Sequence, residues 1–126
     1  MHRSRLAGFI IDCETDDLDR AAEFWSGALG YNARRSDDPS ESNYVLFETG
    51  PDELHIEVQS VDHPSRVHLD IEADDIDAEV KRLEALGATR IKKVNTWVVM
   101  EAPSGQRFCV VRPQRDDFAD KANEWS

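Results

Sequence analysis

The sequence is poor in cysteine and has no long hydrophobic run. Its two cysteines, Cys13 and Cys109, both lie in apolar, strand-like stretches. So few cysteines exclude a disulfide scaffold, and we expect both thiols to be reduced. No apolar run approaches the roughly 20 residues that a membrane-spanning helix needs. The amino-terminal segment turns polar too early for a signal peptide, so a cytoplasmic location is expected.

Positive charge is scarce as well. The chain has 15 Lys and Arg against 26 Asp and Glu, for a net charge of −11. Nucleic acids and anionic membranes bind basic surfaces, so we expect neither as a partner. An acidic pocket would tolerate a cationic small molecule, and acidic residues elsewhere on the surface favour solubility. The length of 126 residues predicts a single domain, 1–126, large enough to bury its own core.

The hydrophobic pattern predicts the same order of strands and helix twice along the chain. Alternating apolar residues predict strands, and spacings of three and four residues predict helices. In the first repeat, about 6–59, the expected elements are a strand at 6–14, a helix at 15–30 and strands at 31–37, 43–49 and 53–59. In the second repeat, about 66–112, they are a strand at 66–72, a helix at 74–87 and strands at 88–94, 96–102 and 106–112. The tail, 113–126, is either a short helix bearing Phe118, Ala122 and Trp125 or a mobile terminus.

Duplication is the clearest structural signal in the chain. Each predicted helix begins in a cluster of aspartates and ends at Ala-Leu-Gly, at 28–30 and at 85–87. Thr15 and Asp16 are the expected N-caps of the first helix, and Gly30 is its expected C-cap. One helix covers one face of a sheet, so two βαβββ repeats predict an α+β fold with a curved mixed sheet around an open cup.

The motifs of these repeats resemble those of the vicinal oxygen chelate superfamily. The matching segments are D-L-D-R-A-x-x-F-W at 17–25 with L-G-Y at 29–31, and H-L-D-I-x-x-D-D-I-D-A-E-V at 68–80 with a later P-S-G turn. The superfamily includes glyoxalase I, extradiol dioxygenases and bleomycin resistance proteins, and the chain is most similar to its glyoxalase-like domain branch. The likeness covers residues 6 to about 112. It implies a small-molecule ligand, a divalent metal (Zn, Fe, Mn or Ni) in many members, and a homodimer.

Side chains alternate between the two faces of a strand, so the apolar set is expected under the helices and the polar set inside the cup. On strand 66–72, Val67, Leu69 and Ile71 are predicted to pack under a helix. The residues predicted to face the cup are Arg66, His68, Asp70 and Glu72 on that strand, His55 and Glu57 on strand 53–59, and Arg107 and Cys109 on the last strand. Strand 96–102 is apolar on both faces, and Trp97, Val99 and Glu101 form one of its two sets.

The resemblance also implies a set of metal ligands, one from the first strand and one from the fourth strand of each repeat. Carried over by position, these are Ile10, Glu57, His68 and Cys109. Ile10 cannot bind a metal, and Cys109 stands where a glutamate is usual. His68 and Glu57 remain as the expected metal ligands and catalytic residues. Cys109 would favour a softer ion such as zinc, and metal-free protein is the other expectation.

Two other interpretations of these residues stay open. His55, Glu57, His68 and Asp70 resemble a non-haem iron site in residue type, although His55 and Glu57 lie about 7 Å apart along one strand. The second interpretation is a purely structural role. His68 would then form a hydrogen bond with Asp70 or Arg66, and Glu57 would form a salt bridge to Arg66 or Arg107.

Two functions follow from these residues. The first is an enzyme, of lyase, isomerase or dioxygenase type, that acts on a small oxygenated metabolite through His68 and Glu57. The expected substrate-binding residues are His55, Asp70, Arg66, Trp97 and Cys109. The alternative is a non-catalytic protein that sequesters a cationic or aromatic compound of antibiotic type, with Trp97 or Tyr44 as a stacking wall.

Overall fold

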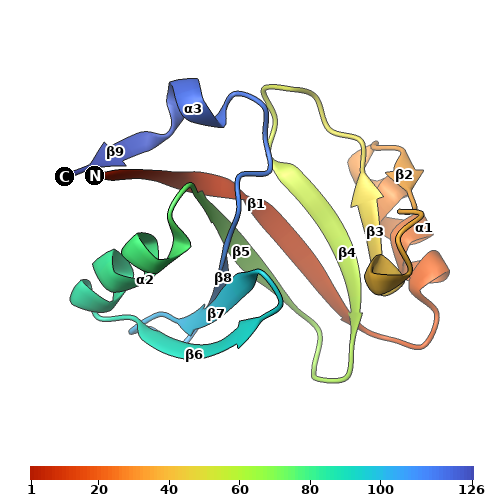
Figure 1. Ribbon diagram of the computed structural model, residues 1–126. Helices are drawn as coiled ribbons and strands as arrows, with labels where there is room; N and C mark the ends of the chain where they lie inside the picture. The colour runs from red at the N-terminus through yellow and green to blue at the C-terminus, as the bar shows by residue number, and fades with distance from the viewer. The chain divides into compact units, whose positions relative to one another are not determined.

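Two strand-rich units, each built around one long helix, make up the computed structural model, which describes residues 1–126 (Figure 1). The first-repeat unit is residues 9–67, and the second-repeat unit is residues 1–8 and 68–126. The elements are β1 (His2–Glu14), α1 (Leu18–Leu29), β2 (Ala33–Arg34), the 3-10 helix η1 (Pro39–Glu41), β3 (Tyr44–Phe47), β4 (His55–Val61), β5 (Arg66–Ala73), α2 (Ile76–Ala85), β6 (Thr89–Val94), β7 (Trp97–Glu101), β8 (Arg107–Val111), α3 (Phe118–Lys121) and β9 (Asn123–Trp125). The predicted βαβββ order is confirmed in both repeats.

Each unit has its own order of strands. In the first-repeat unit the order is β2-β3-β4-β1, and in the second-repeat unit it is β1-β5-β8-β7-β6, with β9 beside the start of β1. β5 and β8 pair in parallel, whereas β6, β7 and β8 pair antiparallel in sequence, as do β2, β3 and β4. The α+β fold class is therefore confirmed.

Local sequence signals fix the ends of α1. The Asp17 side chain accepts a hydrogen bond from the backbone N–H of Arg20 at 3.1 Å, so Asp17 is the N-cap. The prediction of Thr15 and Asp16 was wrong by one or two residues, because the Thr15 hydroxyl instead accepts from the Asp17 N–H and forms the turn before the helix. Gly30 ends the helix in the left-handed region, at φ 80°, as predicted.

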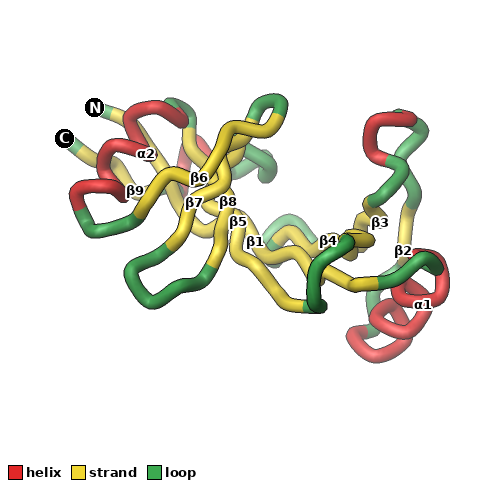
Figure 2. The backbone as a smooth tube through the Cα atoms, turned by 90° about the horizontal axis from the view of Figure 1, so that it is seen from below, coloured by secondary structure: helices red, strands yellow, loops and turns green.

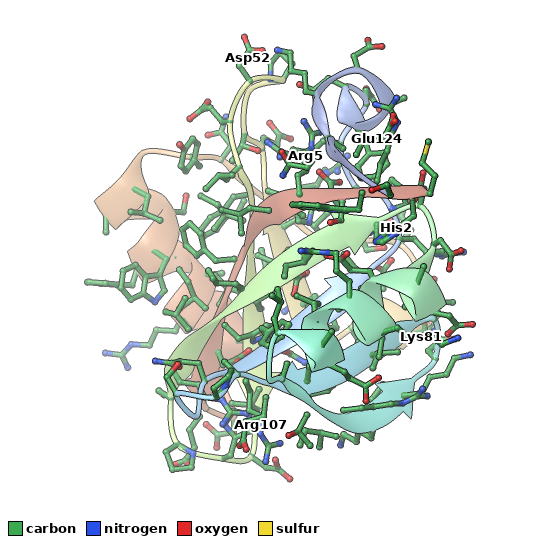
Figure 3. The ribbon with its side chains drawn as sticks, turned by 90° about the vertical axis from the view of Figure 1, so that its left-hand side faces the viewer. His2, Arg5, Asp52, Lys81, Arg107 and Glu124 are labelled. Carbon is green, nitrogen blue, oxygen red and sulfur yellow. The ribbon has the colours of Figure 1, made fainter.

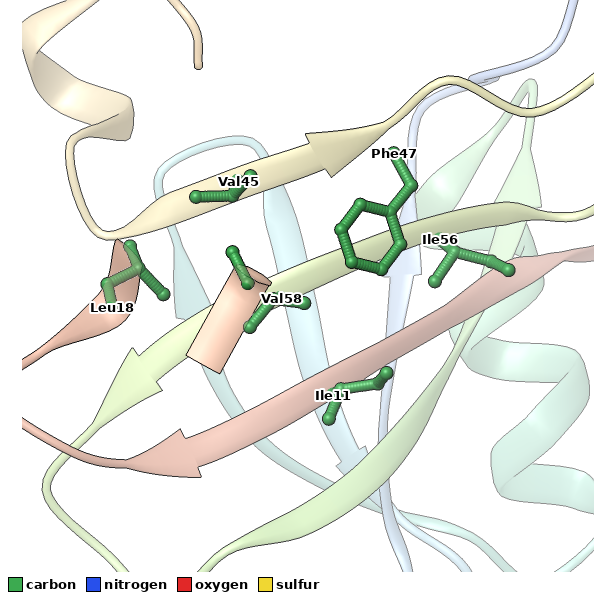
Figure 4. Packing of buried hydrophobic residues seen from close by; sticks show 7 residues of the cluster. Ile11, Leu18, Val45, Phe47, Ile56 and Val58 are labelled. Atoms are coloured by element: carbon green, nitrogen blue, oxygen red, sulfur yellow. The ribbon is translucent and has the colours of Figure 1, made fainter. Parts of the chain in front are cut away.

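An apolar core joins α1 to the strands of the first-repeat unit (Figure 4). Its buried residues are Ile11, Leu18, Ala22, Val45, Phe47, Ile56 and Val58. α1 lies against β3 and β4, and Figure 2 shows α1 beside β2 and β3. Ile11 on β1 and Ile56 and Val58 on β4 all point to the helix, as expected for the apolar set of a strand. Full burial of side chains of this size stabilises the fold by roughly 1.5–3 kcal/mol each.

A second core fills the space between α2 and strands β7 and β8. It consists of Ala73, Val80, Leu83, Val98, Met100 and Val110. Because Val98 and Met100 point inward, the ambiguous phase of β7 is settled: Trp97, Val99 and Glu101 lie on the opposite face.

The predicted burial of β5 was wrong at its start and at its end. Val67 and Leu69, expected under a helix, are 59% and 51% exposed, because α2 packs mainly on β6, β7 and β8. Glu72, expected in the cup, is fully buried. Its carboxylate accepts hydrogen bonds from Arg5 at 2.7 Å and Arg115 at 3.2 Å, and from two backbone N–H groups of the tail (Figure 3 labels Arg5). A charged group tolerates such burial only when it is paired and hydrogen-bonded.

The tail folds back onto the start of β1, so that the two termini lie side by side in both views (Figures 1 and 2). Phe118 and Ala122 are buried as a short helix predicts, but Trp125 belongs to strand β9, where its indole N–H donates to the Ser4 hydroxyl at 2.8 Å. The helix prediction was therefore wrong for Trp125. None of the helices has the length and apolar character required to cross a membrane.

Candidate functional site

Three potential metal ligands meet on one face of the second-repeat unit. His68 and Asp70 lie two residues apart on β5, so their side chains point the same way. Cys109 on β8 lies opposite Asp70 in the parallel register. One ligand atom from each of these three residues lies within 4.8 Å of the other two. We call His68, Asp70 and Cys109 the ligand cluster.

The ligand cluster contains a buried carboxylate oxygen without a hydrogen bond. Oδ1 of Asp70 accepts none, although Nε2 of His68 lies 3.5 Å away. Asp70 and Cys109 are buried, and the His68 side chain is largely so. A buried polar atom left unpaired costs about 1–3 kcal/mol. A cation would remove that cost.

The donor chemistry of the ligand cluster fits a divalent ion. An imidazole, a carboxylate and a thiolate are the three protein ligand types of zinc, and three of them leave one position open. The structure brings Asp70 to His68 and Cys109. The predicted ligand Glu57 lies in the first-repeat unit, and its role as a ligand stays a prediction. Asp70 had been predicted to bind substrate and, in the alternative iron-type set, to join His68 as a ligand. Their spacing of two residues on one strand is the signal that places both on one face.

The same face of the second-repeat unit carries a charged pair. Arg107 donates from Nε to Glu101 at 3.0 Å across the antiparallel β7–β8 pair. The Arg107 side chain is labelled in Figure 3. Val99 lies opposite Cys109, and Trp97 lies half-buried at the start of β7. Trp97, Arg107 and Cys109 thus share one face of β7 and β8.

Glu57 and His55 form a pair of their own in the first-repeat unit. Their side chains lie 2.9 Å apart, and both are less than one-fifth exposed. Beside them, the Gln59 amide donates to the Tyr44 hydroxyl at 2.9 Å, as the β3–β4 register places these two residues opposite each other. Of the four residues that resemble a non-haem iron site, His55 and Glu57 pair in the first-repeat unit, and His68 and Asp70 lie together in the second-repeat unit. The predicted meeting of His68 and Glu57 in one cup stays a prediction.

Arg66 faces Asp12 in the first-repeat unit. The distance from its Nε to the buried Asp12 carboxylate is 3.9 Å, and its Nη2 lies 3.3 Å from Nε2 of His63. Ile10, two residues before Asp12, is only 2% exposed. It has no ligand atom, and the expected loss of the family's first-strand ligand at this position stays a prediction.

The two cysteines have different surroundings. Burial and the negative charge of Asp12 raise the pKa of the Cys13 thiol, so it stays protonated at neutral pH. Its sulfur lies 3.7 Å from the Ile11 carbonyl oxygen, to which the S–H donates. Both cysteines are free thiols, and only Cys109 lies beside other ligand groups.

Comparison with known proteins shows the family. A profile described as a glyoxalase-like domain matches residues 8–111. No curated protein matches the sequence.

Solved structures similar to the chain have low sequence identity and show the fold alone. A hypothetical protein from Bacillus halodurans C-125 is 16% identical, with a TM-score of 0.60 over 90% of this chain and 98% of that one. A methylmalonyl-CoA epimerase from Mycobacterium tuberculosis is 16% identical, with a TM-score of 0.59 over 90% and 91%. A glyoxalase/bleomycin resistance protein/dioxygenase superfamily member from Vibrio splendidus 12B01 is 17% identical, with a TM-score of 0.50 over 87% and 99%.

The duplicated βαβββ order, the motifs at 17–31 and 68–88 and the profile match over most of the chain agree with one another. The chain belongs to the glyoxalase-like domain family of the vicinal oxygen chelate superfamily.

Proposed function

We propose that this protein binds a small oxygenated molecule at the polar face of β5 and β8, through a divalent ion held by the ligand cluster. The observation that carries the proposal is the buried Asp70 oxygen, without a hydrogen bond, between an imidazole and a thiol. Zinc suits these three ligands best, and iron, manganese and nickel are the other candidates. A bound ion of this kind polarises a carbonyl or carboxylate oxygen of its ligand.

The chain's own residues give this site its chemistry. Asp70 and His68 lie 3.5 Å apart on one face of β5, and the burial of Cys109 limits the access of water to its sulfur. Arg107, 37% exposed, retains guanidinium N–H groups besides its bond to Glu101 that suit a ligand oxygen. Trp97 on the same face offers a flat apolar surface. We assign the organic part of the ligand to the space beside these two residues.

The reaction class is proposed from chemistry and from similarity of fold. A polarised carbonyl acidifies the neighbouring carbon, which suits an isomerase or lyase, and one similar structure is a methylmalonyl-CoA epimerase. We propose a cytoplasmic location, in keeping with the reduced cysteines.

The direct test is cobalt binding to purified, chelator-treated protein. Co²⁺ bound by a thiolate gives an intense ultraviolet absorption band, and Zn²⁺ should displace it. We expect the band in the wild-type protein and in Cys13→Ser, which removes the other cysteine. Cys109→Ser should abolish it, and Asp70→Asn should weaken cobalt affinity by about tenfold or more, or about 1.4 kcal/mol. Equal cobalt binding by Cys109→Ser and the wild type would contradict the proposal.

A metal-free binding protein is the competing outcome. It would show no cobalt band, yet cationic aromatic compounds would raise its melting temperature in the presence of chelator. Trp97→Ala should then remove that increase, whereas Trp125→Phe, on β9 of the same unit, should not. The two functions thus predict opposite responses to chelation.

A further inference from the structure

A row of cross-strand neighbours connects the ligand cluster to the edge of the second-repeat unit. Asp70 on β5 lies opposite Cys109 on β8, and Cys109 lies opposite Val99 on β7. Val99 in turn lies opposite Lys92 on β6, the edge strand (Figure 1). Residues that lie opposite each other in an antiparallel pair have their side chains on the same face. Lys92 therefore lies on the face of the ligand cluster, two strands away from Cys109.

A β-bulge gives Lys92 this position. Thr89 lies opposite Glu101 on the same face, and strict alternation from Thr89 would place Ile91 there instead of Lys92. The register shifts between Arg90 and Lys92, so Ile91 is the extra residue and Lys92 takes its place on that face. Bulges are over-represented next to active sites, where they redirect a side chain. The shift thus brings an ammonium group to the face of the ligand cluster.

Lys92 is a positive charge without a partner on this face. Its side chain is exposed and forms no salt bridge within the chain. Arg107, by contrast, is paired with Glu101. A divalent ion in the ligand cluster would be balanced by the Asp70 carboxylate and the Cys109 thiolate. A second anionic group on the ligand would therefore find its counter-charge at Lys92.

Lysines on an edge strand also prevent pairing with other sheets. That role does not depend on the face to which the lysine points, and the next residue, Lys93, fulfils it equally well. Lys93 lies opposite Val98, which is buried under α2, so its side chain lies on the other face of β6. Lys92 and Lys93 are both exposed and carry the same charge. They differ in whether they share a face with the ligand cluster.

We infer that Lys92 binds a second anionic group of the ligand, a carboxylate or a phosphate, so that the ligand is a dianion. The inference rests on the proposed function, because the first oxygen-containing group of the ligand has to bind the ion at the ligand cluster. Two strand spacings, about 10 Å between backbones, separate Lys92 from Cys109. Val99, half-buried between them, provides an apolar floor for the middle of the ligand. The ligand class is thus a short carbon chain with an acid group at each end.

Cobalt-loaded protein at low salt tests the inference with acids of equal chain length. Adipate has a carboxylate at both ends, 6-phosphonohexanoate has a phosphonate at one end, and hexanoate lacks the second anionic group. Binding of a carboxylate to the ion changes the visible absorption bands of Co²⁺, and titration of this change gives the dissociation constant of each acid.

The wild type should bind adipate or 6-phosphonohexanoate at least about fivefold more tightly than hexanoate. A chain with a net charge of −11 repels a dianion more than a monoanion, so this preference requires a local cation. Lys92→Gln should abolish the preference and leave hexanoate binding unchanged. Lys93→Gln, the matched control, should retain the preference. The tighter of the two diacids identifies the second group as a carboxylate or a phosphate.

Failure of this inference can be distinguished from failure of the proposed function. A cobalt band without a preference for either diacid would overturn the inference and leave the metal site in place. A preference that Lys92→Gln retains, or that Lys93→Gln also loses, would do the same. Absence of the cobalt band in the wild type would overturn the proposed function, and this inference with it.

Discussion

The two repeats share their elements but differ in where they place charge. The first-repeat unit buries one acid, Asp12 on β1, beside its apolar core. The second-repeat unit fully buries two glutamates, Glu72 on β5 and Glu79 on α2. Position by position, β1 has Ile10, Asp12 and Glu14 where β5 has His68, Asp70 and Glu72. The comparison shows that a common apolar pattern maintains the fold while the polar face is free to diverge, and that only the second repeat assembles a ligand cluster.

The largest effect should come from the buried acid. Glu72→Ala leaves two guanidinium groups and two backbone N–H groups without their partner, and should lower the free energy of unfolding by about 3–5 kcal/mol. Glu14→Ala, at the same place in the first repeat, removes an exposed side chain and should change it by less than about 0.5 kcal/mol. Urea unfolding at pH 7 measures both. Similar losses in the two variants would show that the two repeats do not differ in how much this acid contributes to stability.

Equivalent buried residues on the core strands of the two repeats should contribute equally to stability. Val58 on β4 and Val110 on β8 are both fully buried beneath their helices. Each valine-to-alanine change should therefore lower the free energy of unfolding by about 2 kcal/mol, from lost burial and the cavity that remains. The same urea experiment compares them. A difference above about 1 kcal/mol would break the equivalence of the two cores.

The glycines that follow the two long helices should differ moderately. Gly30 has φ 80° and open space where a Cβ would lie, so Gly30→Ala should destabilise by about 1 kcal/mol. Gly87 has φ 108°, and its Cβ would lie 3.0 Å from Cγ of Pro103. Gly87→Ala should therefore destabilise by about 2 kcal/mol or more. The shift in the urea midpoint ranks the two, and the reverse ranking would contradict the packing around Gly87.

The smallest effect is a pH dependence that the first repeat lacks. Burial alone would raise the pKa of Glu79, but hydrogen bonds from Arg82, His2 and Ser4 hold that pKa below its usual 4.5. A lowered pKa stabilises the folded state above pH 4.5, and this stabilisation is lost as the pH falls below that value. At the corresponding position, α1 has Ala21.

Glu79→Gln should therefore flatten the decline of the unfolding free energy between about pH 5 and pH 3, relative to the wild type. Glu84→Gln, on the exposed side of α2, is the control and should follow the wild-type curve. Urea unfolding at a series of pH values gives the slopes. Equal slopes for Glu79→Gln and the wild type would show that Glu79 does not contribute to the loss of stability in acid.

Most of the fold could be predicted because its signals are local. Alternation predicts the strands, helical spacing predicts α1 and α2, and glycines mark their ends. The errors arose where distant segments meet. Glu72 is an acid on the polar side of its strand by any local rule, and only the return of the tail past Arg5 buries it. Val67 and Leu69 have the pattern of a buried face, yet α2 packs mainly on other strands.

For the candidate site, the sequence by itself determined the duplicated fold and the common side of β5 on which His68 and Asp70 lie. Alternation along a strand is enough for that, because it needs no knowledge of neighbours. Only the tertiary structure decided which strand lies beside β5. The parallel β5–β8 pairing sets Cys109 opposite Asp70, and so brings the carboxylate and the thiol of the ligand cluster together. Strand order and register depend on contacts between residues far apart in the chain, and these are set by packing of the whole unit.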